Sequence, residues 1–247
     1  MAIAQYLAMT SGEIAGRDLL PPHLAWMACH FSPYGTGLSN LPKWLPAGSL
    51  LILNDRTPIH DHDPVLIATQ LEACAQRLGC SGILLDFQRP GEAQTWELVQ
   101  CLCRMLSCPV AISEPYADAG EGAVFLPPVP ADEPPGSYLS RWHGREIWLE
   151  TALDAQEITL TEHGAAVYPL AAWDCPENGG FSEPRLHCHY RLSLQEDSAI
   201  FTLWRTAGDI QALLDAVAGF GVTAAVGLYQ EFCLFHKEYP LPDLEEG

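Results

Sequence analysis

The chain has 247 residues, 48% of them hydrophobic, which is enough for one large core and a common size for a single α/β barrel. Its 12 basic and 31 acidic residues give a formal net charge of −19, which would repel nucleic acid and anionic lipid. We therefore expect neutral or cationic partners and no nucleic acid. Met1 to Gly16 lacks a cationic segment followed by a long apolar run, and no later stretch approaches about eighteen apolar residues, so no membrane-spanning segment is predicted.

The nine cysteines are an odd number and lack the spacing of extracellular disulfide frameworks. Three of them, Cys101, Cys103 and Cys108, lie close together in a helix-like stretch. On a helix the side chains of Cys101 and Cys103 would diverge, which argues against a zinc or redox site there. We therefore predict reduced, buried thiols in a cytoplasmic protein.

Short apolar runs recur along the chain and read as buried strands of a parallel sheet. The predicted strands are Leu24 to Phe31, Leu50 to Asn54, Gly82 to Phe87, Val110 to Ser113, Ala123 to Leu126, Arg145 to Glu150 and Val222 to Leu228. Helical patterns separate several of them, and such repeated units with short connections favour a sheet closed into a barrel. The predicted fold is a single (β/α)8 TIM-like barrel domain over residues 1–247, incomplete or irregular in its second half.

The helices and the second half complete this reading. Asp63 and Pro64 begin a helix as N-cap and first residue, and its apolar stripe continues to a cap at Gly79. Further helices are predicted over Ala93 to Leu106 and Gly208 to Gly219. The remaining strands are Glu157 to Thr161 and Ala165 to Tyr168 around one turn, and Leu186 to Leu194 and Ala199 to Trp204 around another, with an irregular loop from Trp173 to Pro184.

The segment from Gly79 to Pro90 carries the main functional signal. It reads as a short buried strand whose end bears Asp86 and Gln88. These residues are two apart, so both side chains point to the same face of the strand. At the carboxyl end of a barrel strand, that face looks into the active-site mouth.

This segment resembles the signature of the chitinase-like glycoside hydrolases of family 18, Asp-Gly-x-Asp-x-Asp-x-Glu, usually with an aromatic before the Glu and a Pro two residues after it. Four residues agree with the pattern: Gly82, Asp86, Phe87 and Pro90. Three depart from it: Ser81 and Leu84 stand at the first two acids, and Gln88 stands at the final Glu. The resemblance covers roughly residues 60–115 and 186–232 and implies a TIM barrel.

The resemblance also implies a chemistry. In family 18 the substrate's own acetamide acts as nucleophile, one Asp orients it, and the terminal Glu protonates the departing oxygen. Asp86 matches the orienting residue by position, and Gln88 occupies the position of the acid. A carboxamide has no titratable proton near neutral pH, although it donates and accepts hydrogen bonds. The resemblance thus implies a pocket that binds a carbohydrate or related small polar ligand, without chitinase activity.

Two alternatives remain open. Glu114, followed by Pro115, resembles the acid/base of retaining glycosidases that use two glutamates, and Glu231 follows the last strand. Two catalytic carboxylates about 5 to 5.5 Å apart mark a retaining hydrolase, and about 6.5 to 9.5 Å an inverting one. The other alternative is a noncatalytic interaction protein whose barrel mouth is plugged by the loops after Pro127 and Trp173.

Aromatic and acidic residues near strand ends are the candidate ligand contacts. Flat rings stack on sugar faces, and we expect Tyr34, Tyr116 and Tyr229 to do so, with Asp55 as a polar contact. Tyr229 takes the place where the family resemblance implies an aromatic floor for the sugar, usually Trp.

Two histidine-containing stretches have residue types that ligate metals. They are His60-Asp61-His62-Asp63 and His187-x-His189. Asp63 already serves as a helix cap, and the second pair has no evident third ligand nearby. We therefore predict no metal and no cofactor.

Overall fold

The computed structural model describes residues 2–15, 17, 20–59, 62–89, 93–170, 175 and 180–233. Its contacts form two compact units. The barrel unit comprises residues 2–127, 144–150 and 222–247, and the inserted unit comprises 128–143 and 151–221. The single domain over residues 1–247 stays a prediction. None of the helices in the described part of the chain has the length and apolar character needed to span a bilayer.

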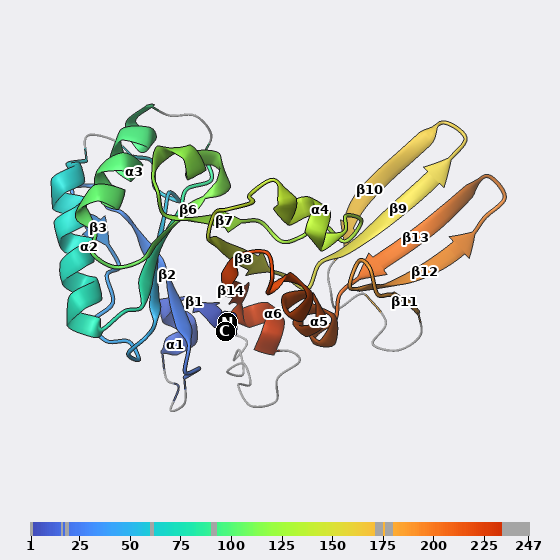
Figure 1. Cartoon of the computed structure of the whole chain (residues 1–247), viewed down its shortest axis with the longest axis horizontal. Coiled ribbons are helices and arrows are strands. Elements are labelled where there is room, and N and C mark those ends of the chain that lie inside the picture. Colours follow the sequence, from blue (N-terminus) through green and yellow to red (C-terminus); the bar gives the residue numbers. More distant parts are fainter. Residues whose placement is uncertain are drawn as a thin grey trace, which may run out of the picture. The chain divides into compact units, whose positions relative to one another are not determined.

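Eight parallel strands in the described part of the barrel unit close into a barrel (Figure 1). In order around the barrel they are β1 (Ala4–Met9), β2 (Leu24–Phe31), β4 (Leu50–Asn54), β5 (Gly82–Asp86), β6 (Val110–Ser113), β7 (Ala123–Leu126), β8 (Ile147–Thr151) and β14 (Val222–Leu228). Strand β1 pairs with both β14 and β2, which closes the ring. A short strand, β3 (Leu38–Ser39), adds to β2 in antiparallel orientation.

The structure confirms the α/β barrel and the seven predicted parallel strands. Strand β1 was not predicted, because its sequence, AQYLAM, contains two alanines and no β-branched residue, and alanine is depleted in strands. Its place in the barrel depends on pairing with β14, more than 200 residues further along the chain. Such a pairing leaves no local signal.

Helices α2 (Pro64–Leu78) and α3 (Ala93–Met105) follow β4 and β5 as predicted. The carboxylate of Asp63 accepts a hydrogen bond from the backbone N–H of Val65, and Gly79 ends α2 with a φ of 65°, in the left-handed region that favours glycine. Three shorter helices lie among the described residues of the unit: α1 (Ser11–Ile14), the 3-10 helix η1 (Glu114–Ala119) and α6 (Tyr229–Cys233).

The strands of the barrel separate two apolar cores, because successive side chains point to opposite faces. One row, including Leu51, Leu53 and Phe87, belongs to the outer core that also contains buried residues of α2 and α3. The alternate row, including Ile52 and Leu84, fills the barrel interior. Every barrel strand therefore continues its inward row to the carboxyl end, where the candidate site lies.

The inserted unit is built on a five-stranded antiparallel sheet. Its strands, in spatial order, are β10 (Gly164–Leu170), β9 (Ala155–Thr161), β13 (Ser198–Trp204), β12 (Cys188–Leu194) and β11 (Phe181–Glu183), and its helices are α4 (Pro135–Ser140) and α5 (Ala207–Val217). The four strands and the helix predicted here are confirmed. The expected loop from Trp173 to Pro184 contains β11, and Trp173 itself lies outside the described residues.

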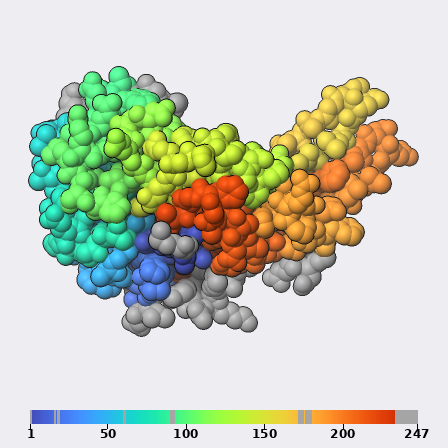
Figure 2. Space-filling model, in the orientation of Figure 1, coloured from blue at the N-terminus to red at the C-terminus, as the bar shows by residue number. Residues whose placement is uncertain are grey.

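The hairpins β9–β10 and β12–β13, yellow and orange in Figure 2, expose apolar side chains, among them Val167 within β10 and Leu194 at the tip of the second hairpin. The opposite end of the sheet is held by Arg205, whose side chain is 3% exposed. Its guanidinium donates hydrogen bonds to four backbone carbonyls, those of Val129, Pro130, Leu186 and His187. One side chain thus ties the segment before α4 to the strands.

Candidate functional site

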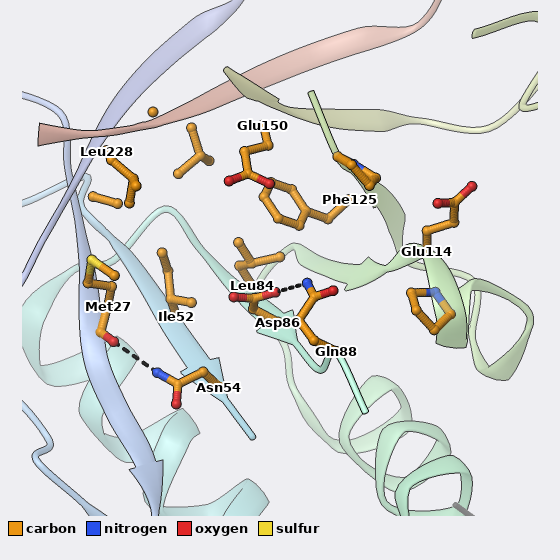
Figure 3. A pocket seen from close by; sticks show the side chains of 15 residues that line it. Met27, Ile52, Asn54, Leu84, Asp86, Gln88, Glu114, Phe125, Glu150 and Leu228 are labelled. Atoms are coloured by element: carbon orange, nitrogen blue, oxygen red, sulfur yellow. Dashed lines mark hydrogen bonds between the residues drawn. The ribbon is translucent and has the colours of Figure 1, made fainter. Parts of the chain in front are cut away.

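A cavity of about 340 Å³ lies at the carboxyl ends of the barrel strands (Figure 3). This volume is within the range of pockets for small molecules, about 300 to 1,000 Å³. Its apolar lining includes Ile52, Leu84, Phe125, Val226 and Leu228, and its polar lining consists of Asn54, Asp86, Gln88, Glu114 and Glu150. Every lining residue belongs to the barrel unit.

The strand period explains why two of the polar residues face inward. Asp86 comes two residues after Leu84, which fills the barrel interior, so its carboxylate points the same way. Glu150 stands in the same relation to Trp148 on β8. The strand ending at Glu150 was predicted, but Glu150 was not named as a site residue. The alternation through Trp148 was the signal that could have identified it.

Asp86 and Gln88 contact each other in the cavity. The Gln88 Nε2 atom donates a hydrogen bond to Asp86 Oδ1 at 2.5 Å (Figure 3). Burial raises the pKa of the Asp86 carboxyl, the hydrogen bond from Gln88 partly lowers it, and the charge of Asp55 raises it. Both side chains line the mouth, as the strand period predicts. Their roles in ligand binding and catalysis stay predictions.

The raised pKa gives a stability prediction for Asp86→Asn. The folded chain binds this proton more tightly than the unfolded chain, so wild-type stability falls as pH rises above the ordinary pKa of 3.8. Asparagine removes that penalty and still accepts the bond from Gln88. At pH 7 we expect the variant to be more stable by about 1 kcal/mol, a rise of about 2 to 4 °C in melting temperature.

Calorimetry at several pH values measures this difference, which should shrink as the pH approaches 3.8. A lower melting temperature for Asp86→Asn at pH 7 would contradict this assignment of the buried charge.

Asp55 holds the loop that carries Gln88. Its Oδ2 atom accepts hydrogen bonds from the backbone N–H groups of Gln88, at 3.1 Å, and of Arg89, at 2.8 Å. The structure places Asp55 beside the loop after β5 and in the lining of a second cavity, and its predicted contact with ligand stays a prediction. Its observed contacts position the amide of Gln88.

The second cavity, about 440 Å³, adjoins the first and shares four lining residues with it. They are Met27, Asn54, Asp86 and Gln88. Asn54 donates to the carbonyl of Met27 at 2.9 Å and accepts from the backbone N–H of Arg56, so its amide links β2 to the loop after β4. The second cavity is also lined by His30 and Arg56. The mouth therefore continues over the ends of β2 and β4.

The other predicted residues are dispersed. Glu114 begins η1 and lines the first cavity, whereas Glu231 lies in α6 and does not line it, so the structure does not bring the two glutamates together there. Tyr34 is 98% exposed. Tyr116 and Tyr229 are fully buried in the outer core, where the Tyr116 hydroxyl donates to a backbone carbonyl and the Arg17 guanidinium lies over the Tyr229 ring. None of the three tyrosines lines either cavity, and their ligand contacts stay predictions.

In the described part of the chain, no three His, Cys, Asp or Glu side chains lie close enough together to hold a metal ion. His60 and Asp61 lie outside the described residues. In the inserted unit, His189 Nδ1 lies 2.8 Å from Asp209 Oδ2, and Asp209 also accepts hydrogen bonds from Thr206 at the N-cap of α5.

No protein-family model and no curated protein matches the chain. Among solved structures, it is similar to a family 18 N-acetylglucosaminidase from Paenibacillus barengoltzii, with a TM-score of 0.60, 10% identity, and 92% of this chain and 95% of that one covered. It is also similar to a chitinase-like agglutinin from Robinia pseudoacacia, with a TM-score of 0.57, 11% identity, and 90% of this chain and 93% of that one covered. A third similar structure is a family 18 chitinase from Cycas revoluta in complex with (GlcNAc)3, with a TM-score of 0.56, 9% identity, and 91% of this chain and 94% of that one covered. At these identities the likeness shows the shared fold, the TIM barrel of chitinase-like proteins.

Proposed function

We propose that the barrel unit binds a carbohydrate in the cavity at its strand ends and does not hydrolyse chitin-type substrates. The observation that carries the proposal is the Gln88 amide, hydrogen bonded to the Asp86 carboxylate inside that cavity. Similar folds support the carbohydrate: one of them is an agglutinin, and another is in complex with (GlcNAc)3.

The lining of the cavity suits a sugar. Sugar rings present apolar C–H faces and a rim of hydroxyl groups, and pockets for them combine aromatic or aliphatic walls with a few polar groups. Here the Phe125 ring and aliphatic side chains such as Leu84 form the walls (Figure 3). The carboxylates of Asp86 and Glu150 supply acceptors for hydroxyl groups.

The same lining supports the proposed lack of hydrolysis by the family 18 mechanism. That mechanism requires a proton donor beside the orienting Asp, and Gln88 has no proton to transfer near neutral pH. Its amide N–H group is already directed at Asp86. Gln88 thus has nearly the size of a glutamate and still forms hydrogen bonds, but it cannot donate the proton that hydrolysis requires.

We also propose a reducing compartment such as the cytoplasm. In the part of the chain that the structure describes, cysteines such as Cys29, Cys74 and Cys80 carry thiols that form no disulfide. Burial raises the pKa of the Cys29 thiol to about 12 and that of Cys80 to about 11. Such thiols stay protonated and unreactive.

Titration calorimetry with amino-sugar oligomers, both acetylated and unacetylated, tests the proposed site. We expect Asp86→Ala to weaken binding by at least about tenfold, because a hydrogen bond to a charged group contributes about 1.5 to 3 kcal/mol. Asp118→Ala, an exposed residue of η1 outside the cavity, is the matched control and should bind like wild type. No binding of any glycan across a broad panel would favour the interaction protein with a plugged mouth.

A further inference from the structure

The first cavity contains three carboxylates and, among the described residues that line it, no basic side chain. We propose that its ligand is an amino-sugar oligomer with free, protonated amines, and not a fully N-acetylated one, an inference that rests on the proposed carbohydrate site. The site itself is the cavity at the strand ends. Its carboxylates decide the charge of what the cavity holds.

The three carboxylates come from separate elements and surround the cavity. Asp86 ends β5, Glu150 lies near the end of β8, and Glu114 begins η1. In Figure 3 their side chains lie around the labelled apolar residues Leu84 and Phe125. Apolar walls screen charge poorly and focus the field in a concave site, so the three carboxylates act on the same space.

Hydrogen-bond chemistry leads to the same ligand. An ionised carboxylate only accepts hydrogen bonds, and an ammonium group only donates them. An acetamide carries a carbonyl oxygen that itself requires a donor. The two amide side chains of the cavity carry two N–H donors each, and one donor of each is already engaged, that of Asn54 by the Met27 carbonyl and that of Gln88 by Asp86. The lining therefore satisfies an amine better than an acetamide.

Charge on a wider scale acts in the same direction. The chain has a formal net charge of −19, which raises the local concentration of cationic oligomers and speeds their association. Burial raises the pKa of the Asp86 carboxyl, and a cation bound beside it would lower that pKa again. Cation binding is thus coupled to ionisation of the site.

The test is titration calorimetry of the full chain with glucosamine and N-acetylglucosamine oligomers of equal length, at pH 6 and low salt. We expect the glucosamine oligomer to bind at least tenfold more tightly, with an advantage that shrinks as salt is added. Glu150→Gln and Glu114→Gln should each weaken glucosamine binding by at least threefold. Both should weaken N-acetylglucosamine binding by a smaller factor, because only the hydrogen bonds to sugar hydroxyl groups change there and no ammonium group loses an opposite charge. The matched control is Glu121→Gln, which removes an exposed carboxylate outside this cavity and should change neither affinity.

The outcomes separate this inference from the proposed function. Equal or tighter binding of the acetylated oligomer overturns the inference and leaves the carbohydrate site standing. A glucosamine preference that Glu150→Gln and Glu114→Gln leave unchanged also overturns it, because the charge would then come from elsewhere. Failure of both oligomers to bind overturns the proposed function itself.

Discussion

Gln88→Glu is expected to raise turnover of an oligomer bearing both acetamides and free amines by about 100-fold or more over Gln88→Ala, the usual contribution of a general acid. The acetamides supply the nucleophile that family 18 chemistry requires. The new carboxyl group would lie where Gln88 Nε2 now lies, 2.5 Å from Asp86 Oδ1. Two carboxyl groups this close share a proton, which raises one pKa and keeps an acid protonated near neutral pH.

The substitution needs no repacking, since the Gln88 side chain is exposed and glutamate has nearly the same size. Leu84 is the remaining difference from the family signature next to Asp86, and it is fully buried in the barrel interior. A second change, Leu84→Asp, supplies the missing acid if Gln88→Glu alone is too slow. Chromatography of the released products measures the turnover of both variants. Native protein that already turns over these oligomers, with Gln88→Ala equally active, would assign the chemistry to other residues.

Arg205→Ala is expected to destabilise the inserted unit by about 4 kcal/mol, because it leaves one buried and three partly buried carbonyls without their donor. The loss also leaves the half-buried Asp154 without the positive charge that lowers its pKa. Hydrogen exchange read by mass spectrometry measures the effect unit by unit. Protection should fall in β12 and β13 and persist in the barrel strands β4 and β5.

Arg185→Ala is the matched control. Arg185 is exposed, and its backbone N–H donates a hydrogen bond to Glu183, not to those four carbonyls. It should leave protection unchanged. Equal protection of β12 and β13 in Arg205→Ala and wild type would contradict the assignment of Arg205 as the clamp of this unit.

The barrel was predictable from the sequence because strands buried on both faces read as continuous apolar runs. Leu50 to Asn54 and Gly82 to Phe87 are of this kind, and the caps of α2 mark the helix between them. Strand β1 could not be predicted in this way, because its pairing partner β14 lies far along the chain. Strand β11 was expected as loop for a related reason: its three residues are too few to show a period.

At the site, the strand period was sufficient to place Asp86 and Gln88 at the mouth. It did not show which way a residue after a strand turns, and Tyr229 and Tyr116 turn into the outer core. The contact of Asp55 with the Gln88 backbone joins residues 33 apart, so no local pattern could indicate it.

A crystal structure of the chain grown with a glucosamine oligomer tests most directly whether the barrel mouth is a carbohydrate site. The predicted result is a sugar ring against Phe125, with an amine within hydrogen-bond distance of the Asp86 or Glu150 carboxylate. An empty cavity at saturating oligomer, with the sugar bound elsewhere on the chain, would contradict it.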